Sequence, residues 1–144
     1  MKILVLARSE FQHVEYTDKV AFISIHNPNV DSPIFPDSEN VLNLWFDDVE
    51  EDYGYELLNG DRIVYFNDFM ADKIYKFVKL NESKKGFVIH CTMGKCRSGA
   101  VGSVLVDYFQ IPYLEFLKLN PRVQPNILVK KLLTERFFGN SFEI

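Results

Sequence analysis

Four short runs of apolar residues stand out along the chain, and each predicts a buried β-strand. The predicted strands are Lys2–Leu6, Val20–Ile25, Val41–Phe46 and Gly86–His90. Polar or proline-containing stretches separate these runs, and the runs themselves are nearly continuous in their apolar character. Such runs are typical of a parallel sheet that is covered on both faces.

Helical patterns lie between and after the predicted strands. The predicted helices are Ser9–Val14, Asn67–Leu80, Ser98–Phe109, Pro112–Leu119 and Pro125–Phe138. Asn67 or Asp68 is expected to cap the second helix, because short polar side chains accept hydrogen bonds from a first helical turn. Pro112 and Pro125 are expected within the first turns of their helices, where a missing N–H is tolerated.

In two of the predicted helices, Asn67–Leu80 and Ser98–Phe109, the apolar residues recur at helical spacing, so they are expected to lie on one face of each helix. The expected faces are Phe69, Met70, Ile74, Phe77 and Val78 in one helix, and Val101, Val104, Leu105, Tyr108 and Phe109 in the other. Strands that alternate with helices predict a three-layer α/β/α fold around a four-stranded parallel sheet. Sites in such folds lie at the carboxyl ends of the strands, which directs attention to the residues after Ile25, Phe46 and His90.

Length and composition narrow the class of protein. The 144 residues suit a single domain, residues 1–144, and the net charge of −4 gives no overall attraction to nucleic acid or anionic lipid. The N-terminal apolar run is too short for a signal peptide, and no run approaches the roughly 18 residues of a membrane span. We therefore expect a cytoplasmic protein, monomeric, that binds neither nucleic acid nor membrane.

The residues from His90 to Gly99 carry the chemistry: His90-Cys91-Thr92-Met93-Gly94-Lys95-Cys96-Arg97-Ser98-Gly99. They join a predicted strand to a predicted helix through a tight turn. The amides of such a turn form a nest for an anion, and the helix adds the positive end of its dipole. The planar guanidinium of Arg97 suits two phosphate oxygens at once.

Cys91 stands at the start of this turn. The field that attracts an anion also favours a thiolate, so the pKa of Cys91 is expected below its usual value of about 8.5. Ser98 is expected to donate a hydrogen bond to the sulfur, and Lys95 adds positive charge at the rim. His90 is expected to orient the turn by hydrogen bonding rather than to act as an acid or base.

The spacing His-Cys, five residues, Arg-Ser resembles the signature of the protein tyrosine phosphatase superfamily, and the central Gly94 makes it most similar to the compact dual-specificity phosphatases. Phe46-Asp47-Asp48-Val49 resembles the general-acid loop of these enzymes, and Pro121–Asn126 resembles the turn before their last helix. The resemblance therefore extends over nearly the whole chain. It implies catalysis by Cys91, Arg97, Asp48 and Ser98, and substrate binding by Thr92, Met93, Gly94, Lys95, Cys96 and Arg97.

The general acid is expected to be Asp48 or Asp47, which cannot both point into the site if the segment is extended. Compact relatives keep the aspartate that directly precedes a small aliphatic residue, which favours Asp48. Glu50, Glu51 and Asp52 are expected to be solvated charge. Gln124 is expected to be a turn residue, with the positioning of a hydrolytic water as the alternative, and Asn126 to be structural.

The two cysteines, Cys91 and Cys96, lie too close in sequence to staple a fold, and no cluster of ligands suggests zinc. No metal or cofactor is expected, because the positive turn can do a cation's work. Oxidation would join Cys91 to Cys96 if the two sulfurs can meet. Finding sulfinic acid at Cys91 with no bridge after mild peroxide would rule this out, and Cys96 would then be an inert packing residue.

Together these features predict a phosphatase that hydrolyses phosphomonoesters through a phosphocysteine. Phosphorylated proteins are the expected substrates, with phosphotyrosine, phosphoserine and phosphothreonine all admitted by a shallow pocket. The segment 27–40 is expected to form a surface loop near the pocket. A non-protein substrate (a phosphoinositide, a nucleotide or an RNA end) and a phosphate-binding module without turnover remain alternatives.

Overall fold

The computed structural model describes residues 1–51 and 62–139. Its elements in chain order are β1 (Lys2–Ala7), α1 (Arg8–Phe11), β2 (Ala21–His26), β3 (Val41–Trp45), α2 (Asp68–Leu80), β4 (Gly86–Cys91), α3 (Arg97–Tyr108), α4 (Tyr113–Leu119) and α5 (Ile127–Phe138). Each predicted strand and helix is present, with ends displaced by at most a few residues. No helix in the described ranges has the length and apolar character needed to cross a membrane.

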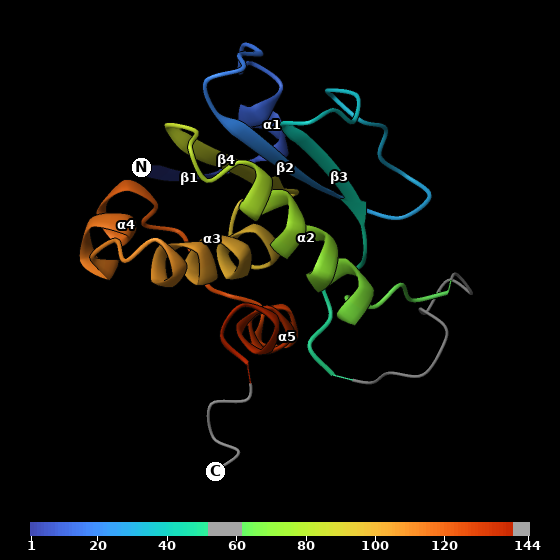
Figure 1. Cartoon of the computed structure of the whole chain (residues 1–144). Coiled ribbons are helices and arrows are strands. Elements are labelled where there is room, and N and C mark those ends of the chain that lie inside the picture. Colours follow the sequence, from blue (N-terminus) through green and yellow to red (C-terminus); the bar gives the residue numbers. More distant parts are fainter. Residues whose placement is uncertain (52–61, 140–144) are drawn as a thin grey trace.

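The four strands form one parallel sheet in the order β1-β4-β2-β3, which confirms the predicted α/β fold (Figure 1). Ala7 is paired with Cys91 in the first two strands, and His26 with Trp45 in the last two. The carboxyl ends of all four strands therefore meet at one edge of the sheet. The segments that follow them at this edge begin at Arg8, Asn27, Phe46 and Thr92.

The two faces of the sheet are covered unequally. Helices α2, α3 and α5 lie on one side, where they bury the main core against Ile23, Ile89 and their neighbours (Figure 1). On the other side the only described helix is α1, and the smaller core around Phe11 and Phe22 is completed by Phe35 from the loop after β2. Three layers are present, and the second helical layer is thin.

Helix α3 lies at the centre of the thick side, against β1 and β4 on one side and α5 on the other. Every residue from Arg97 to Val106 is buried. The residues expected on one face, among them Val101, Val104 and Leu105, lie in the core as predicted, and the other sides of the helix are buried as well because neighbours surround it.

Helix α2 follows its predicted pattern in part. Asn67 caps the helix, accepting a hydrogen bond from the Met70 amide at 3.0 Å, and Ile74, Phe77 and Val78 are buried as expected. Phe69 is wrongly placed in the prediction, since 67% of it is exposed. The Lys73 ammonium group lies over the Phe69 ring, 4.9 Å from the ring centre, so the exposed ring makes a cation–π contact at the surface.

The two prolines precede their helices instead of occupying first turns. Pro112 is the N-cap of α4 and has extended backbone angles. Pro125 lies one residue before Asn126, the N-cap of α5, whose side chain accepts from the Val129 amide. Because the Asn126 side chain can cap the first helical turn and proline has no such acceptor, the helix begins after Asn126.

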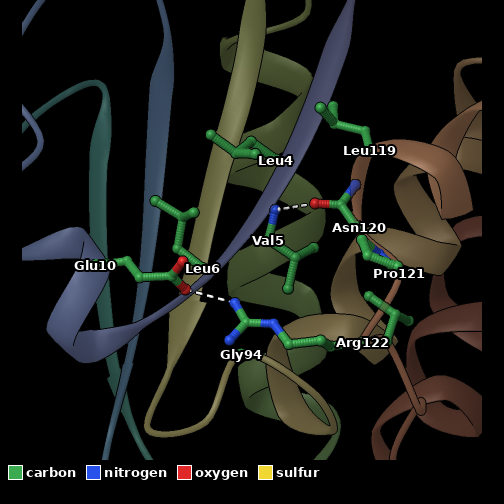
Figure 2. Close-up of a pocket in the computed structure, with 10 residues that line it drawn as sticks. Leu4, Val5, Leu6, Glu10, Gly94, Leu119, Asn120, Pro121 and Arg122 are labelled. Atoms are coloured by element: carbon green, nitrogen blue, oxygen red, sulfur yellow. Dashed lines mark hydrogen bonds and ion pairs between the residues drawn. The ribbon is translucent and has the colours of Figure 1, made fainter.

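Asn120 completes the outer edge of the sheet. β1 is an edge strand, so its outward backbone groups have no neighbouring strand. The Asn120 side chain accepts from the Val5 amide at 2.7 Å, as a strand would (Figure 2). It also donates to the Ile3 carbonyl at 2.9 Å. One buried side chain thus replaces a missing strand partner and ties the start of the chain to the end of α4.

Asn120→Ala is expected to lower the free energy of unfolding by about 2–4 kcal/mol, because it leaves the Val5 amide and the Ile3 carbonyl without their partner. Urea unfolding would measure the loss. Leu119→Ala is the control, since Leu119 is the adjacent residue and is 48% exposed. A loss no larger than that of the control would contradict this role.

Candidate active site

The 91–97 loop connects the end of β4 to the start of α3 at the edge where the strands terminate. Three of its carbonyl groups are turned outward and bound by neighbours: Thr92 O by the Arg8 amide, Lys95 O by the Gln124 amide and Cys96 O by the Asn126 amide, at 3.2, 3.0 and 2.9 Å. The N–H and C=O of a trans peptide point in opposite directions. The amides that follow these carbonyls therefore face the inner side of the loop, next to the positive end of α3.

Gly94 allows the loop to make its turn. Its φ is +67°, a conformation that costs an L-residue with a side chain, and its backbone presses against β1. A Cβ atom at this position would lie 2.6 Å from the backbone nitrogen of Ala7 and from the carbonyl carbon of Leu6. Only glycine fits here without moving the strand or the loop.

The Cys91 thiol is buried and faces the N-terminus of α3. Its sulfur lies 3.0 Å from the Ser98 hydroxyl oxygen. Burial by itself raises the pKa of Cys91, but hydrogen bonds from the hydroxyl and amide of Ser98, the charge of Arg97 and the amide of Lys95 outweigh it. The net pKa is lowered, which favours the thiolate as the sequence predicts.

Arg97 is a buried cation, with 4% of its surface exposed. Its Nη1 donates to the Phe46 carbonyl at 2.8 Å and its Nη2 donates to the Thr92 hydroxyl at 3.1 Å. Nε has no partner among the described residues, although it is fully buried. A buried charged donor without an acceptor is costly, so the guanidinium is suited to receive an anion on this edge.

The remaining loop residues differ in their surroundings. The Thr92 hydroxyl also accepts a hydrogen bond from the Asn27 side chain at 2.9 Å, so it braces Arg97 against the segment after β2. Met93 is 60% exposed at the surface of the loop. Lys95 is half-buried. The hydrogen bond between Asn27 and Thr92 places the start of the 27–40 segment next to the 91–97 loop, as expected.

His90 does not orient the loop by hydrogen bonding. It is completely buried, and neither ring nitrogen has a hydrogen-bond partner within residues 1–51 and 62–139. Its ring instead packs on Phe11, with 4.2 Å between ring centres. Burial, with a smaller contribution from His26, lowers the pKa of His90 to about 3, so the ring is neutral near pH 7 and acts by packing.

Two adjacent aspartates follow β3 and have different partners. Asp47 is held by Val64: its amide donates to the Val64 carbonyl, and its Oδ2 accepts from the Val64 amide, both at 2.8 Å. Asp48 is exposed and accepts at Oδ1 from the Asn126 side chain at 2.8 Å, and its Oδ2 has no hydrogen bond to a described residue. Each carboxylate therefore has one oxygen without a hydrogen bond to a described residue, and the two differ in exposure: Asp48 is exposed, whereas Asp47 is half-buried and tied to Val64.

Glu50 is exposed, as expected of solvated charge, and it also makes one contact with the protein. Its Oε1 accepts from the Ile127 amide at 3.1 Å, so it contributes to the N-terminus of α5. Glu51 is exposed, and Asp52 lies outside the described residues.

Cys96 lies within the 91–97 loop, and Gln124 lies beside it. Both cysteines are free thiols, and burial followed by the charge of Asp48 raises the pKa of Cys96, in contrast to Cys91. A disulfide between Cys91 and Cys96 on oxidation stays a prediction. Gln124 is exposed, and its backbone amide donates to the Lys95 carbonyl of the loop. The positioning of a hydrolytic water by its side chain stays a prediction.

A cavity of about 310 Å³ lies on the outer side of Gly94, between β1 and the turn after α4 (Figure 2). An ion pair between Glu10 and Arg122 spans it. Neither Cys91 nor Arg97 lines this cavity, so it is separate from the thiol. Within residues 1–51 and 62–139, no three His, Cys, Asp or Glu side chains are grouped so that they could hold a metal ion.

Two residues outside the 91–97 loop contact the site, Asn27 and Asn126. The structural role predicted for Asn126 is confirmed, because it caps α5, whereas the contact of Asn27 with Thr92 has no counterpart in the sequence analysis. A short polar residue before a helix is a signal for the capping role of Asn126. Its contact with Asp48 spans 78 positions of the chain and leaves no local pattern.

Comparison with known proteins adds no family assignment: no protein-family model matches the chain, and no match is found among curated proteins. The resemblance to the protein tyrosine phosphatases therefore rests on the 91–97 loop and on the residues around it.

Ser98→Ala is expected to raise the pKa of Cys91, because a hydrogen bond to a charged group contributes about 1.5–3 kcal/mol and here favours the thiolate. Thiolate absorbance at 240 nm, followed against pH, would measure the change. Cys91→Ser leaves Cys96 as the other cysteine and identifies its titration, which is expected at higher pH than that of Cys91. An unchanged Cys91 midpoint in Ser98→Ala would contradict the assigned hydrogen bond.

Proposed function

We propose that the chain is a cysteine-dependent phosphatase that hydrolyses phosphomonoesters. The observation that carries the proposal is the pairing of a thiol of lowered pKa with a buried arginine. Cys91 and Arg97 lie at the two ends of one loop, whose inward amides and helix terminus favour an anion. A thiolate and a phosphate group are attracted by the same positive field.

In the first step the Cys91 thiolate attacks phosphorus, and the bond from phosphorus to the ester oxygen breaks. Arg97 and the loop amides stabilise the equatorial oxygens as charge develops on them. Asp48 gives a proton to the departing oxygen, so an alcohol or phenol leaves and a phosphocysteine remains.

In the second step water attacks the phosphocysteine. Asp48, now a carboxylate, accepts a proton from that water, and the sulfur leaves as thiolate while inorganic phosphate forms. The Ser98 hydroxyl, 3.0 Å from the sulfur, stabilises the thiolate as it is released. Asp48 returns to its acid form, and the cycle needs no other proton donor.

The preferred substrate carries one phosphate. Two arginines near the strand ends are already occupied: Arg8 donates to the His26 ring and to the Ser32 carbonyl, and Arg122 pairs with Glu10. Neither is free for a second phosphate, which disfavours polyphosphorylated lipids. An exposed Asp48 and an exposed Met93 at the rim support a shallow site that admits phosphotyrosine, phosphoserine and phosphothreonine on proteins. We also propose that the protein is a monomer and is located in the cytoplasm.

Cys91→Ser is expected to lower hydrolysis of para-nitrophenyl phosphate by about 10⁴-fold or more, because the nucleophile is removed. It should still bind tungstate or phosphate. Arg97→Ala should lose both activity and anion binding, since the guanidinium is the principal cation of the loop. The assay contains a chelator, and calorimetry measures anion binding. Full activity in reduced Cys91→Ser would refute the proposal.

Asp48→Asn is expected to slow substrates with poor leaving groups by about 10²-fold or more and to affect good leaving groups much less. The measurement is kcat across a series of aryl phosphates with leaving groups of different acidity. Asp47→Asn is the matched control, because it changes the adjacent carboxylate that Val64 holds. If Asp47→Asn shows the leaving-group effect and Asp48→Asn does not, the assignment is wrong.

A further inference from the structure

Asn126 connects three parts of the molecule and is completely buried. Its backbone amide donates to the Cys96 carbonyl of the 91–97 loop at 2.9 Å. Its side-chain oxygen accepts from the Val129 amide at 3.0 Å and caps α5. Its side-chain nitrogen donates to Asp48 Oδ1 at 2.8 Å and to the Val49 carbonyl at 3.2 Å.

The three groups of Asn126 that make these four hydrogen bonds have different roles. The cap accounts for Oδ1 alone, and a serine would perform it equally well. The Nδ2 contacts serve the segment that carries Asp48. The backbone amide fixes this nitrogen relative to the loop that holds Cys91. A helix cap by itself therefore does not explain why the residue is an asparagine.

The geometry at Asp48 has a chemical consequence. Oδ1 accepts from Asn126 whether the carboxyl group is neutral or charged, so the proton of the neutral acid resides on Oδ2. That oxygen has no hydrogen bond to a described residue. Because Asp48 is exposed, an unanchored side chain would sample several rotamers, and a general acid needs a fixed direction to its proton acceptor.

We propose that Asn126 is a positioning residue that aims the free oxygen of Asp48 at the leaving group. This inference rests on the proposed phosphatase function and deepens it. The upstream end of the same segment is held by the bond from Arg97 to the Phe46 carbonyl. The groups that bind phosphate and the group that donates the proton are thus linked on both sides of Asp48.

Asn126→Ser separates the two roles of the side chain. The serine hydroxyl keeps an acceptor for the Val129 amide and leaves the backbone bond to Cys96 in place, but it removes the donor to Asp48. Asn67→Ser is the matched control, because Asn67 caps α2 through the Met70 amide and makes the same chemical change at a helix start. Both variants are first compared by thermal unfolding.

The test measures kcat on the aryl phosphate series for wild type, Asn126→Ser, Asp48→Asn and the double variant. Asn126→Ser is expected to lose about 10-fold or more on the poorest leaving group and much less on the best. In the Asp48→Asn background the same change is expected to have no further effect on the leaving-group dependence. Asn67→Ser is expected to match wild type throughout.

Two results would overturn the inference. One is a uniform loss across all leaving groups, which a cap of α5 alone would produce. The other is an equal loss in the presence and absence of Asp48, which would show that the two side chains act independently.

Failure of the proposed function gives a different pattern. If wild type shows no Cys91-dependent turnover, the phosphatase proposal fails and Asn126 positions no acid, whatever its effect on unfolding. If wild type is active and Asp48→Asn shows the leaving-group effect while Asn126→Ser does not, the phosphatase proposal stands and the inference about Asn126 fails.

Discussion

The buried guanidinium of Arg97 is the constraint on which the rest of the site depends. A cation with 4% of its surface exposed must be given acceptors by the fold. These come from the ends of different strands: the Phe46 carbonyl after β3 and the Thr92 hydroxyl after β4, which is braced in turn by Asn27 after β2. Satisfying one charge therefore draws together segments that are distant in the sequence. The edge that remains, Nε, faces no protein acceptor among the described residues.

The alternation of side chains in β4 explains the different fates of Cys91 and His90. Adjacent residues of a strand face opposite sides of the sheet. Cys91 faces the thick side, where the N-terminus of α3 can lower the pKa of the thiol. His90 faces the thin side, where it packs on Phe11 and is neutral near pH 7. Two residues that are adjacent in the sequence thus lie on opposite faces of the sheet, one at the candidate site and one in the smaller core.

Local chemistry made much of this structure predictable. The four strands, the Gly94 turn and the helix after Arg97 all follow from short segments whose apolar pattern or turn residue is sufficient. Predictions weakened where a distant partner decides the outcome. Asp47 is held by Val64, which lies 17 positions along the chain, and Asp48 is held by Asn126, which lies 78 positions along it. No pattern within a short window records such contacts.

The position of Asp48, the proposed general acid, also depends on the packing of the core. Asn126 contacts Asp48 with one end of its side chain and begins α5 with the other. That helix buries Val129 and Leu133 against α2 and α3, and α3 is the helix that carries Arg97. A displacement of α5 would therefore move Asp48, the proposed proton donor, relative to Cys91, the proposed nucleophile, even though α5 carries neither residue. The packing of α5 and the geometry of the proposed reaction therefore depend on each other, because Asn126 contributes to both.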